Sequence, residues 1–433
     1  MIRLSTTEPG FAAAFAALVD ARREPDADVS RDVRTILASV RDEGDAALAA
    51  CTRKFDGHDL ADTGWRIERA DWQAAYDALD RPLRDALHLA ADRIRAYHER
   101  QRPADSAFTD DAGVRLGARW NAVDAAGIYV PGGRAAYPSS VLMNAIPARV
   151  AGVGRLAMVT PTPHGAINPL VLAAALVAGV DEVWRVGGAQ AIAALAYGTD
   201  RIRPVDVVTG PGNAWVAEAK RQLYGVVGID MVAGPSEIVV LADGANDPEW
   251  IAADLLSQAE HDIVTQSILF TEDAGFADRV AAAVDRQIGT LATAKVARTA
   301  WDANGAIIVV ASLAEAVPLV DRLAPEHIQI ATDDPQSLFD QVRHAGSVFL
   351  GRHTPEAIGD YVAGPNHVLP TGRRARFSSG LSVLDFMKRT SFLQMTEASL
   401  ATLGPATVAL ARAEGLPAHA RSVALRLRLN ADE

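Results

Sequence analysis

The stretch Val205-Asp-Val-Val-Thr-Gly-Pro-Gly-Asn213 joins a short β-branched run to a helical pattern that ends at Tyr224. β-branched residues favour strands, and the two glycines allow the chain to turn sharply before the helix begins. A strand, a glycine-rich turn and a helix in this order form the repeating unit of a parallel sheet with crossover helices. The stretch therefore predicts an α/β fold.

The same pattern recurs on both sides of this stretch. Upstream, predicted strands at Gly127–Val130, Leu156–Thr160 and Glu182–Val186 each lead through a turn into a helical pattern. Downstream, a second alternating set predicts strands at Glu237–Ala242, Gln266–Thr271, Ala306–Val310, Ile328–Ala331 and Ser347–Leu350. We therefore expect two doubly wound, Rossmann-like parallel-sheet domains, with helical segments at the N-terminus and the C-terminus.

The change from helical to alternating patterns sets the expected domain boundaries. Residues 1–22 are expected to form an N-terminal helical segment, and residues 382–433 a helical C-terminal tail. Residues 23–128 together with residues 236–381 are expected to form the first α/β domain. Residues 129–235 then form a second Rossmann-like domain that is inserted into the first.

The composition bears on the partners and the compartment of the protein. Its 433 residues are 49% hydrophobic and 22% charged, with a formal net charge of −12, which disfavours nucleic acid and anionic membranes as partners. The longest apolar stretch, Leu170–Gly179, is too short to span a membrane, and no secretory signal is apparent. We therefore expect a cytoplasmic protein. The single cysteine, Cys51, lies in helical sequence and is expected to pack rather than to react.

Glycine-rich turns follow three of the expected strands, at Gly132-Gly133, Gly187-Gly188 and Gly210-Pro-Gly212. Backbone N–H groups at a helix N-terminus hold anions, and the carboxyl ends of parallel strands are where such folds bind nucleotides. None of the turns matches the full G-x-G-x-x-G fingerprint. Two interpretations therefore remain: the turns bind a nucleotide at this edge of the sheet, or the glycines only allow the chain to turn.

Two polar clusters interrupt the apolar sequence and are candidates for chemistry. In the first, Gln258 and His261 lie three residues apart in a helical pattern, so one helix face offers an amide oxygen and an imidazole nitrogen to a metal ion. In the second, Glu326-His327 precede the expected strand Ile328–Ala331, where a carboxylate and an imidazole can exchange protons with a substrate. Each has a structural alternative: a hydrogen-bonded histidine on a helix face, and a surface turn.

A series of segments in this order resembles the histidinol dehydrogenase family, whose members catalyse the last two steps of histidine biosynthesis. The resemblance covers nearly the whole chain and is weakest over the first hundred residues. It rests on Gly127–Gly133, Val186–Ile192, Gly210–Asn213, Ala233–Glu237, Gln258–Asp262, Ala324–His327, Gly359–Tyr361, Gly364–Gly372 and Glu414–His419.

The resemblance implies a role for each of several residues. It implies one Zn²⁺ per subunit, held by Gln258, His261, Asp360 and His419. It implies a catalytic pair, Glu326 and His327. The implied substrate contacts are Ser236 and Glu414 together with the zinc ligands and the catalytic pair, and the implied contacts to NAD are Tyr129, Gln190 and Asn213. The family is a homodimer in which the C-terminal tail reaches the partner's active site, so Glu414 and His419 are expected to come from the other subunit.

The implied reaction is a zinc-dependent, NAD-linked, four-electron oxidation of L-histidinol to L-histidine by way of L-histidinal. Two oxygen and two nitrogen ligands suit a borderline cation such as Zn²⁺. The nearest alternative is a dehydrogenase of the same superfamily that oxidises another small alcohol, for example a sulfonated diol. Alternatives from other classes are a zinc hydrolase, for which the chain lacks an H-E-x-x-H pair, and an inactive nucleotide-binding scaffold.

Overall fold

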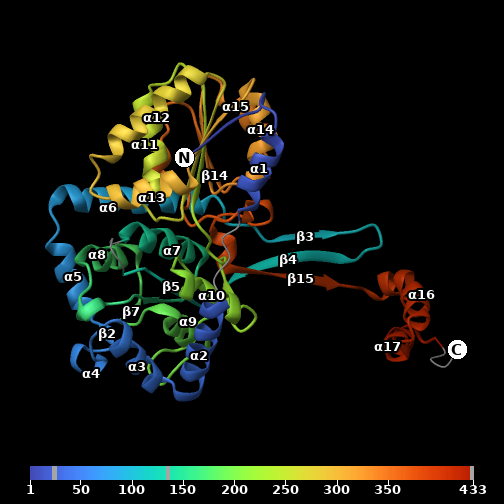
Figure 1. Ribbon diagram of the computed structural model, residues 1–433. Helices are drawn as coiled ribbons and strands as arrows, with labels where there is room; N and C mark the ends of the chain where they lie inside the picture. Colours follow the sequence, from blue (N-terminus) through green and yellow to red (C-terminus); the bar gives the residue numbers. More distant parts are fainter. Residues whose placement is uncertain (22–26, 133–136, 430–433) are drawn as a thin grey trace. The chain divides into compact units, whose positions relative to one another are not determined.

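The computed structural model describes residues 1–21, 27–132 and 137–429, so Gly133 of the first glycine turn lies outside the described residues. The chain divides into a larger compact unit, Met1–Gln101 with Val123–Phe386, and a smaller unit, Arg102–Ala122 with the chain from Met387 onward. Two six-stranded sheets lie in the larger unit and a three-stranded sheet in the smaller one (Figure 1). Within the described residues, no helix is both long and apolar enough to span a membrane.

The first six-stranded sheet is parallel throughout and has the strand order β1-β12-β11-β10-β13-β14. Its strands are β1 (Ile2–Ser5), β10 (Glu237–Ala242), β11 (Gln266–Thr271), β12 (Ala306–Val309), β13 (His327–Ala331) and β14 (Ser347–Leu350). Strands β11 and β12 continue from β10 toward one edge, where β1 is outermost, and β14 continues from β13 toward the other. The boundary between β10 and β13 is therefore the topological switch point of this sheet.

Helices cover both faces of the first sheet because alternate residues of each strand point to opposite sides. Ile238 and Val240 of β10 pack on one face, against α11 (Pro248–Ala259), α12 (Ala274–Ile288) and α13 (Ala294–Asn304). Val239 and Leu241 pack on the other face, against α1 (Phe11–Asp20), α14 (Leu313–Leu323) and α15 (Pro335–Phe339). Burial on both faces explains why β10 is almost wholly apolar, with Glu237 at its start followed by five apolar residues.

The second six-stranded sheet has the order β2-β7-β6-β5-β8-β9. Only the pairing of β2 with β7 is antiparallel among the described strands of this sheet. Its strands are β2 (Arg66–Ile67), β5 (Ala125–Tyr129), β6 (Arg155–Val159), β7 (Glu182–Trp184), β8 (Val207–Thr209) and β9 (Gly228–Ile229). Here the strand order changes direction between β5 and β8, so this sheet has its own switch point.

Helices also cover the second sheet on both sides (Figure 1). One side packs against α2 (Ala27–Glu43), α3 (Asp45–Phe55), α9 (Gly188–Tyr197) and α10 (Ala214–Leu223), with the short α4 (Leu60–Thr63) beside them. On the other side lie α5 (Arg69–Asp77), α6 (Arg81–Glu99), α7 (Pro138–Ala151) and α8 (Pro169–Ala178). Short 3-10 turns complete the larger unit: η1 (Pro163–Gly165), η2 (Glu356–Ile358), η3 (Arg374–Arg376) and η4 (Val383–Phe386).

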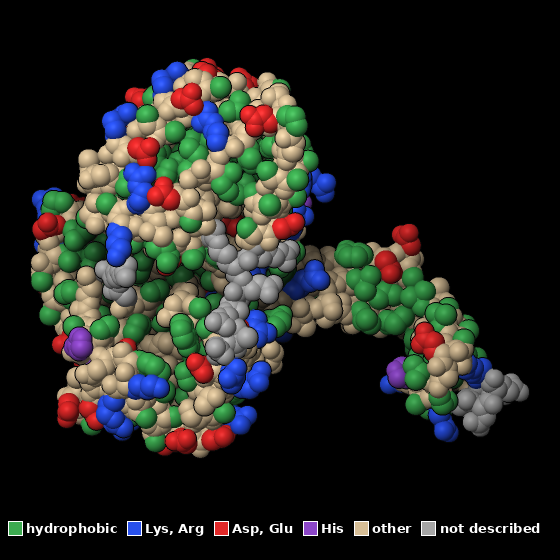
Figure 2. Space-filling view, viewed as in Figure 1, with side chains coloured by type: hydrophobic (Ala, Val, Ile, Leu, Met, Phe, Trp, Pro, Cys, Tyr) green, Lys and Arg blue, Asp and Glu red, His purple; other side chains and the backbone are tan. Residues whose placement is uncertain are grey.

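The smaller unit contains a three-stranded antiparallel sheet and a pair of helices. The sheet consists of β3 (Ser106–Thr109), β4 (Arg115–Ala122) and β15 (Met387–Gln394), and the helices are α16 (Glu397–Ala413) and α17 (Pro417–Leu427). The buried core of the helix pair consists of only a few small side chains, such as Val408 and Ala424. Large apolar side chains stay exposed in this unit: Leu393, Leu403, Leu410, Leu416 and Leu425. Figure 2 shows hydrophobic atoms gathered on this part of the surface.

The predicted α/β fold with parallel sheets is confirmed, but three local expectations are wrong. Residues 1–22 are not wholly helical, because β1 forms the edge of the first sheet beside β12. Residues 23–128 do not all accompany the first sheet, because β2 and β5 belong to the second. The tail 382–433 is not wholly helical, because β15 pairs with β4. The boundaries proposed for the domains stay a prediction.

Candidate active site

The predicted catalytic pair lies at the amino end of β13, beside the amino end of β10. Helix α14 ends at Leu323, Ala324 adopts a left-handed conformation with φ 43°, and Pro325 cannot extend the helix. The chain then enters the sheet with His327 paired to Ile238 of β10. Both Glu326 and His327 are 5% exposed. Because both side chains are buried, Glu326 and His327 do not form the surface turn that the sequence left open as an alternative.

The hydrogen bonding of His327 determines which ring nitrogen carries the proton. Nδ1 lies 3.1 Å from the backbone carbonyl oxygen of Glu237, which can only accept, so Nδ1–H donates. Nε2 then has a free lone pair, and it lies 3.6 Å from Oε1 of Glu356. Burial lowers the pKa of His327 to about 4, although the nearby Asp360 carboxylate raises it. His327 is therefore neutral at pH 7 and can accept a proton at Nε2.

Glu326 is held at the same strand ends. Its Oε2 accepts the backbone N–H of Glu237 at 3.2 Å, and Ser236 hydrogen bonds to the same carboxyl group. Burial raises the pKa of Glu326 well above its ordinary value, and these hydrogen bonds only partly oppose the shift. A buried carboxylate with a raised pKa is a strong base toward water or a hydroxyl group.

His327 and two nearby carboxyl groups could share one cation. Ligand atoms of His327, Glu356 and Asp360 all lie within 4.8 Å of one another. Glu356 opens the turn η2, where it is buried and accepts a hydrogen bond from Ser257 Oγ at 3.1 Å. Burial, with the Asp360 charge, raises the pKa of Glu356 to about 8. The turn η2 is a 3-10 turn that ends at Ile358, two residues before Asp360.

The pKa of Asp360 moves in the opposite direction. Burial alone would raise the pKa, but a hydrogen bond from His367 and the nearby positive charges lower it below the ordinary value. Nδ1 of His367 lies 3.6 Å from Oδ1 of Asp360. Asp360 is therefore a carboxylate at neutral pH, as a metal ligand must be.

Gln258 lies in the last turn of α11, which contacts η2, and the geometry differs in one respect from the prediction. The helix ends at Ala259, so His261 lies in the turn beyond it rather than on the same helix face. Gln258 is buried, and among the described residues its Oε1 has no hydrogen-bond partner. A positive charge on His261 would lower the pKa of both His327 and Asp360. An orphaned amide oxygen, an imidazole and a carboxylate together fit a divalent cation.

The residues expected to contact NAD lie at the carboxyl edge of the second sheet. Tyr129 ends β5, and its Oη accepts the N–H of Gly188 at 3.2 Å. Gln190 is buried in the first turn of α9. Asn213 caps α10 by accepting the N–H groups of Trp215 and Val216, at 3.1 and 3.2 Å. Tyr129 and Asn213 flank the switch point between β5 and β8, where open α/β sheets bind ligands, while Gln190 follows β7.

Side-chain contacts connect this edge of the second sheet with Glu326, His327, Glu356 and Asp360 at the first sheet, here called the acid–base group. Ser140 lies in the first turn of α7, which follows β5, and its Oγ is 3.5 Å from Nε2 of His367. The other ring nitrogen of His367 faces Asp360. Next to it, the Asn366 amide donates to the carbonyl of Met143 in α7 at 2.6 Å. A dinucleotide at the second sheet would therefore lie beside the acid–base group.

Glu414 and His419 are not part of the larger unit. Glu414 is the C-cap of α16, and His419 lies in the first turn of α17. Both are exposed. Exposed polar side chains on a unit with few buried contacts of its own are available to another chain.

The family model described as histidinol dehydrogenase matches residues 20–427 of this chain. The chain belongs to the histidinol dehydrogenase family. The histidinol dehydrogenase of Zymomonas mobilis is 64% identical over 427 residues, which are 99% of each protein. That of Rhodospirillum rubrum is 61% identical over 98% of each protein. The solved histidinol dehydrogenase from Elizabethkingia anophelis has a TM-score of 0.94 and 35% identity, with 99% of this chain and 98% of that chain covered.

Membership of the histidinol dehydrogenase family confirms the resemblance seen in the sequence, but two polar side chains of the site were not predicted. Glu356 follows Thr354-Pro355, so the sequence signals an acidic residue at the start of a helix, where it would be solvated. His367 stands in a loop sequence with no periodic pattern. A signal for Glu356 was its position four residues before Asp360, but its burial cannot be seen locally.

Proposed function

We propose that this member of the histidinol dehydrogenase family oxidises L-histidinol to L-histidine in two steps, with L-histidinal bound in between and two NAD molecules reduced. The observation that carries the proposal is the buried pair Glu326 and His327. His327 has a proton-accepting Nε2, and its ring lies beside the carboxyl groups of Glu356 and Asp360, which fit a cation. No cysteine lies near them in the sequence, so the aldehyde step is assigned to water rather than to a thiol.

The metal proposal names Zn²⁺, held by Gln258, His261, Asp360 and His419. Bound zinc would supply positive charge that fixes the imidazole and amino nitrogens of the substrate. Gln258 supports this role because its buried Oε1 lacks a partner among the described residues. Asp360 supports it because His367 keeps it ionised. Glu356 then remains outside the ligand set and faces Nε2 of His327.

In the first oxidation, His327 accepts the hydroxyl proton of the alcohol at Nε2 while a hydride leaves the same carbon for NAD. The Glu237 carbonyl fixes the ring by accepting Nδ1–H, and this bond also supports the imidazolium ion that forms. The products of this step are the aldehyde, NADH and a proton on His327.

In the second oxidation, Glu326 removes a proton from water as its oxygen bonds to the aldehyde carbon. After His327 has released its first proton to solvent, the hydrated aldehyde loses a hydride to a second NAD while His327 accepts a hydroxyl proton. Ser236 and the N–H of Glu237 hold the Glu326 carboxyl group in place during this step. The step consumes one water and leaves the carboxylate of L-histidine.

The active site is proposed to be shared between two subunits. Glu414 of the partner subunit would contact the substrate, and His419 of the partner subunit would complete the ligand set. Support comes from their exposure in the smaller unit and from the large apolar side chains exposed beside them, such as Leu410 and Leu425. The cytoplasmic location expected from the sequence stays a prediction.

The reaction is tested by counting NADH formed per L-histidinol consumed, before and after treatment with a chelator. Two NADH per substrate are expected, with activity lost on chelation and restored by Zn²⁺. One NADH per substrate would contradict the water-activation step, because only the alcohol would then be oxidised. If the zinc-loaded protein does not turn over L-histidinol, other small alcohols become the substrates to test.

A further inference from the structure

A buried ion pair lies beneath the glycine turn that follows β8. Lys220 of α10 and Asp230, which follows β9, form a salt bridge, and their side chains are 2% and 1% exposed. The carboxylate of Asp230 also accepts the N–H of Met231 at 2.6 Å. Neither the proposed chemistry nor the proposed ligand set uses this pair.

Both members of the pair bind the same residue of the turn. Lys220 Nζ donates to the carbonyl oxygen of Gly210 at 3.0 Å, and Asp230 Oδ2 accepts the N–H of Gly210 at 2.8 Å. Gly210 has φ 114°, and a Cβ atom there would lie 2.1 Å from the carbonyl oxygen of Tyr129. The turn is therefore held between the end of β5 on one side and two charges on the other.

Stability alone does not account for an ion pair in this position. Removing two charges from water costs so much that apolar side chains of similar volume are often equally or more stabilising. What such side chains cannot do is bind the N–H and the C=O of Gly210 at once. The benefit of the pair is therefore the fixed conformation of the turn that leads to Asn213, the N-cap of α10.

We propose that Lys220 and Asp230 are positioning residues for the dinucleotide, which hold the turn Gly210–Asn213 in the conformation that binds it. The inference rests on the proposed NAD site at the carboxyl edge of the second sheet. Backbone N–H groups at a strand-to-helix turn bind a pyrophosphate only if the turn keeps its shape, because no flexible side chain can compensate for a displaced backbone.

The test is Lys220→Met combined with Asp230→Asn, which removes both charges and leaves no unpaired buried ion. The Kd for NAD, measured by calorimetry, is expected to rise about tenfold or more. The kcat at saturating NAD and the KM for L-histidinol should change less than about twofold, since the acid–base group is untouched. A merely structural role would instead lower the active fraction and leave the Kd of the folded protein unchanged.

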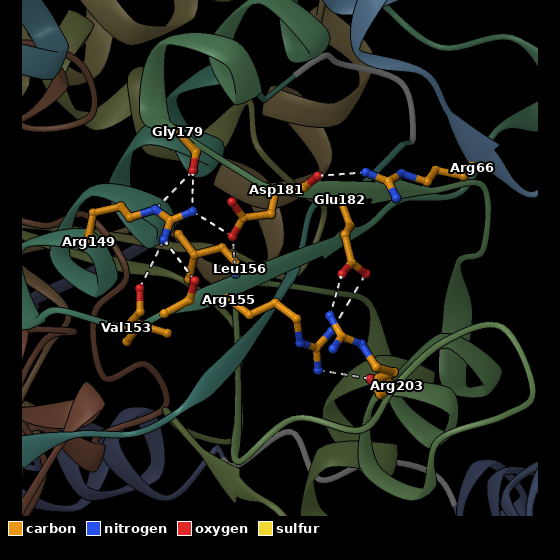
Figure 3. A network of polar contacts seen from close by, with 10 residues as sticks. Arg66, Arg149, Val153, Arg155, Leu156, Gly179, Asp181, Glu182 and Arg203 are labelled. Atoms are coloured by element: carbon orange, nitrogen blue, oxygen red, sulfur yellow. Dashed lines mark hydrogen bonds and ion pairs between the residues drawn. The ribbon is translucent and has the colours of Figure 1, made fainter.

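A matched control removes a second ion pair from the opposite edge of the same sheet. Arg155 and Glu182 lie at the amino ends of β6 and β7, with 3.6 Å between Nη1 and Oε2, in the network of Figure 3. Arg149 and Asp181 extend this network, with 2.6 Å between Nη2 and Oδ2. The variant Arg155→Met with Glu182→Gln should lose stability but keep the Kd for NAD.

The outcomes separate this inference from the proposed function. If the native protein shows no saturable binding of NAD, the proposed function fails and the inference falls with it. If the native protein binds NAD and the Lys220/Asp230 variant binds it no more weakly than the control does, only the inference is overturned.

Should the double variant fail to fold, Asp230→Glu keeps both charges and displaces the carboxylate by one methylene. The same rise in Kd is then expected, and an unchanged Kd would overturn the inference.

Discussion

Burial shifts the pKa of Glu326 upward and that of His327 downward, because each charged form loses its hydration. The two shifts suit different tasks. His327 is neutral at pH 7 and ready to accept a proton, while an ionised Glu326 is a stronger base than an exposed carboxylate. Both shifts come from the position of these residues at the amino end of β13, beneath α11 and η2.

Replacing Glu326 by Gln tests the division of tasks within the pair. The amide keeps the size of the side chain but cannot accept a proton from water, so aldehyde oxidation should fall about 100-fold or more. Oxidation of L-histidinol to the aldehyde should fall less. Single-turnover measurements started from L-histidinol and from L-histidinal separate the two steps. Equal losses in both would argue against water activation by Glu326, whereas His327→Asn should slow both.

Glu356 offers a test of which side chains bind the metal. If Gln258, His261, Asp360 and His419 form the ligand set, Glu356→Gln should keep about one zinc per subunit, since four protein ligands complete the site. It should lower kcat about tenfold or more, because the neighbour of His327 Nε2 is changed. Elemental analysis of the dialysed variant checks the prediction. Loss of zinc would make Glu356 a ligand, and Asp360→Asn is the positive control for that loss.

At the scale of elements, the turn after β8 depends on one glycine. Gly210→Ala would place a Cβ atom 2.1 Å from the Tyr129 carbonyl oxygen and should be strongly destabilising. Gly225 is the matched control, because its φ is 104° but nothing lies within 4 Å of the position that a Cβ atom would take. Gly225→Ala should cost about 1–2 kcal/mol for its backbone conformation alone. Denaturant unfolding of both variants measures the difference, and equal costs would contradict the close approach of β5 and the turn.

The contact between α2 and α10 predicts a pH effect on stability. Arg221, Gln222 and Ser30 all bond to the Glu218 carboxylate, and these bonds lower its pKa to about 2 from an ordinary 4.5. Because the folded pKa is depressed, the stabilisation is fully present above about pH 4.5 and is lost as the pH falls toward 2. Glu218→Gln should lower the free energy of unfolding by about 1 kcal/mol at pH 7 and by less at pH 2.5.

Denaturant titrations at several pH values check this prediction. The Glu249→Gln variant is the control, since that carboxylate also bonds to an arginine and a glutamine but is exposed. Its effect should be smaller at every pH. A Glu218→Gln variant that loses the same stability at pH 2.5 as at pH 7 would show that packing, and not the charge, joins the two helices.

At the scale of the whole molecule, the proposed sharing of the active site can be tested with two inactive variants. His327→Asn and His419→Asn homodimers should each have little activity. After unfolding and refolding as an equal mixture, half of the dimers are mixed, and each mixed dimer has one intact site. Activity should therefore return to about a quarter of the native value. If His419 served its own chain, no mixed dimer would have an intact site, and no activity would return.

The apolar strands show which parts of the fold can be predicted from the local sequence. The predicted strands Glu237–Ala242, Gln266–Thr271 and Ser347–Leu350 agree with β10, β11 and β14. Each is a short run rich in β-branched or aromatic residues, and such a composition favours a strand whatever the rest of the chain does. Strands β1 and β15 carry no comparable signal. They form because β12 and β4 offer them free edges from distant parts of the chain.

By itself, the sequence determined the α/β class, the two sets of alternating strands and helices, and the family to which the chain belongs, because these depend on local patterns and ordered motifs. Only the tertiary structure decided where β1, β2 and β15 pair, the burial of Glu356 and the pair of Lys220 with Asp230. The physical reason is that desolvation and strand pairing depend on neighbours tens or hundreds of residues away. Such contacts cannot be predicted from a residue's type and its near neighbours in the sequence.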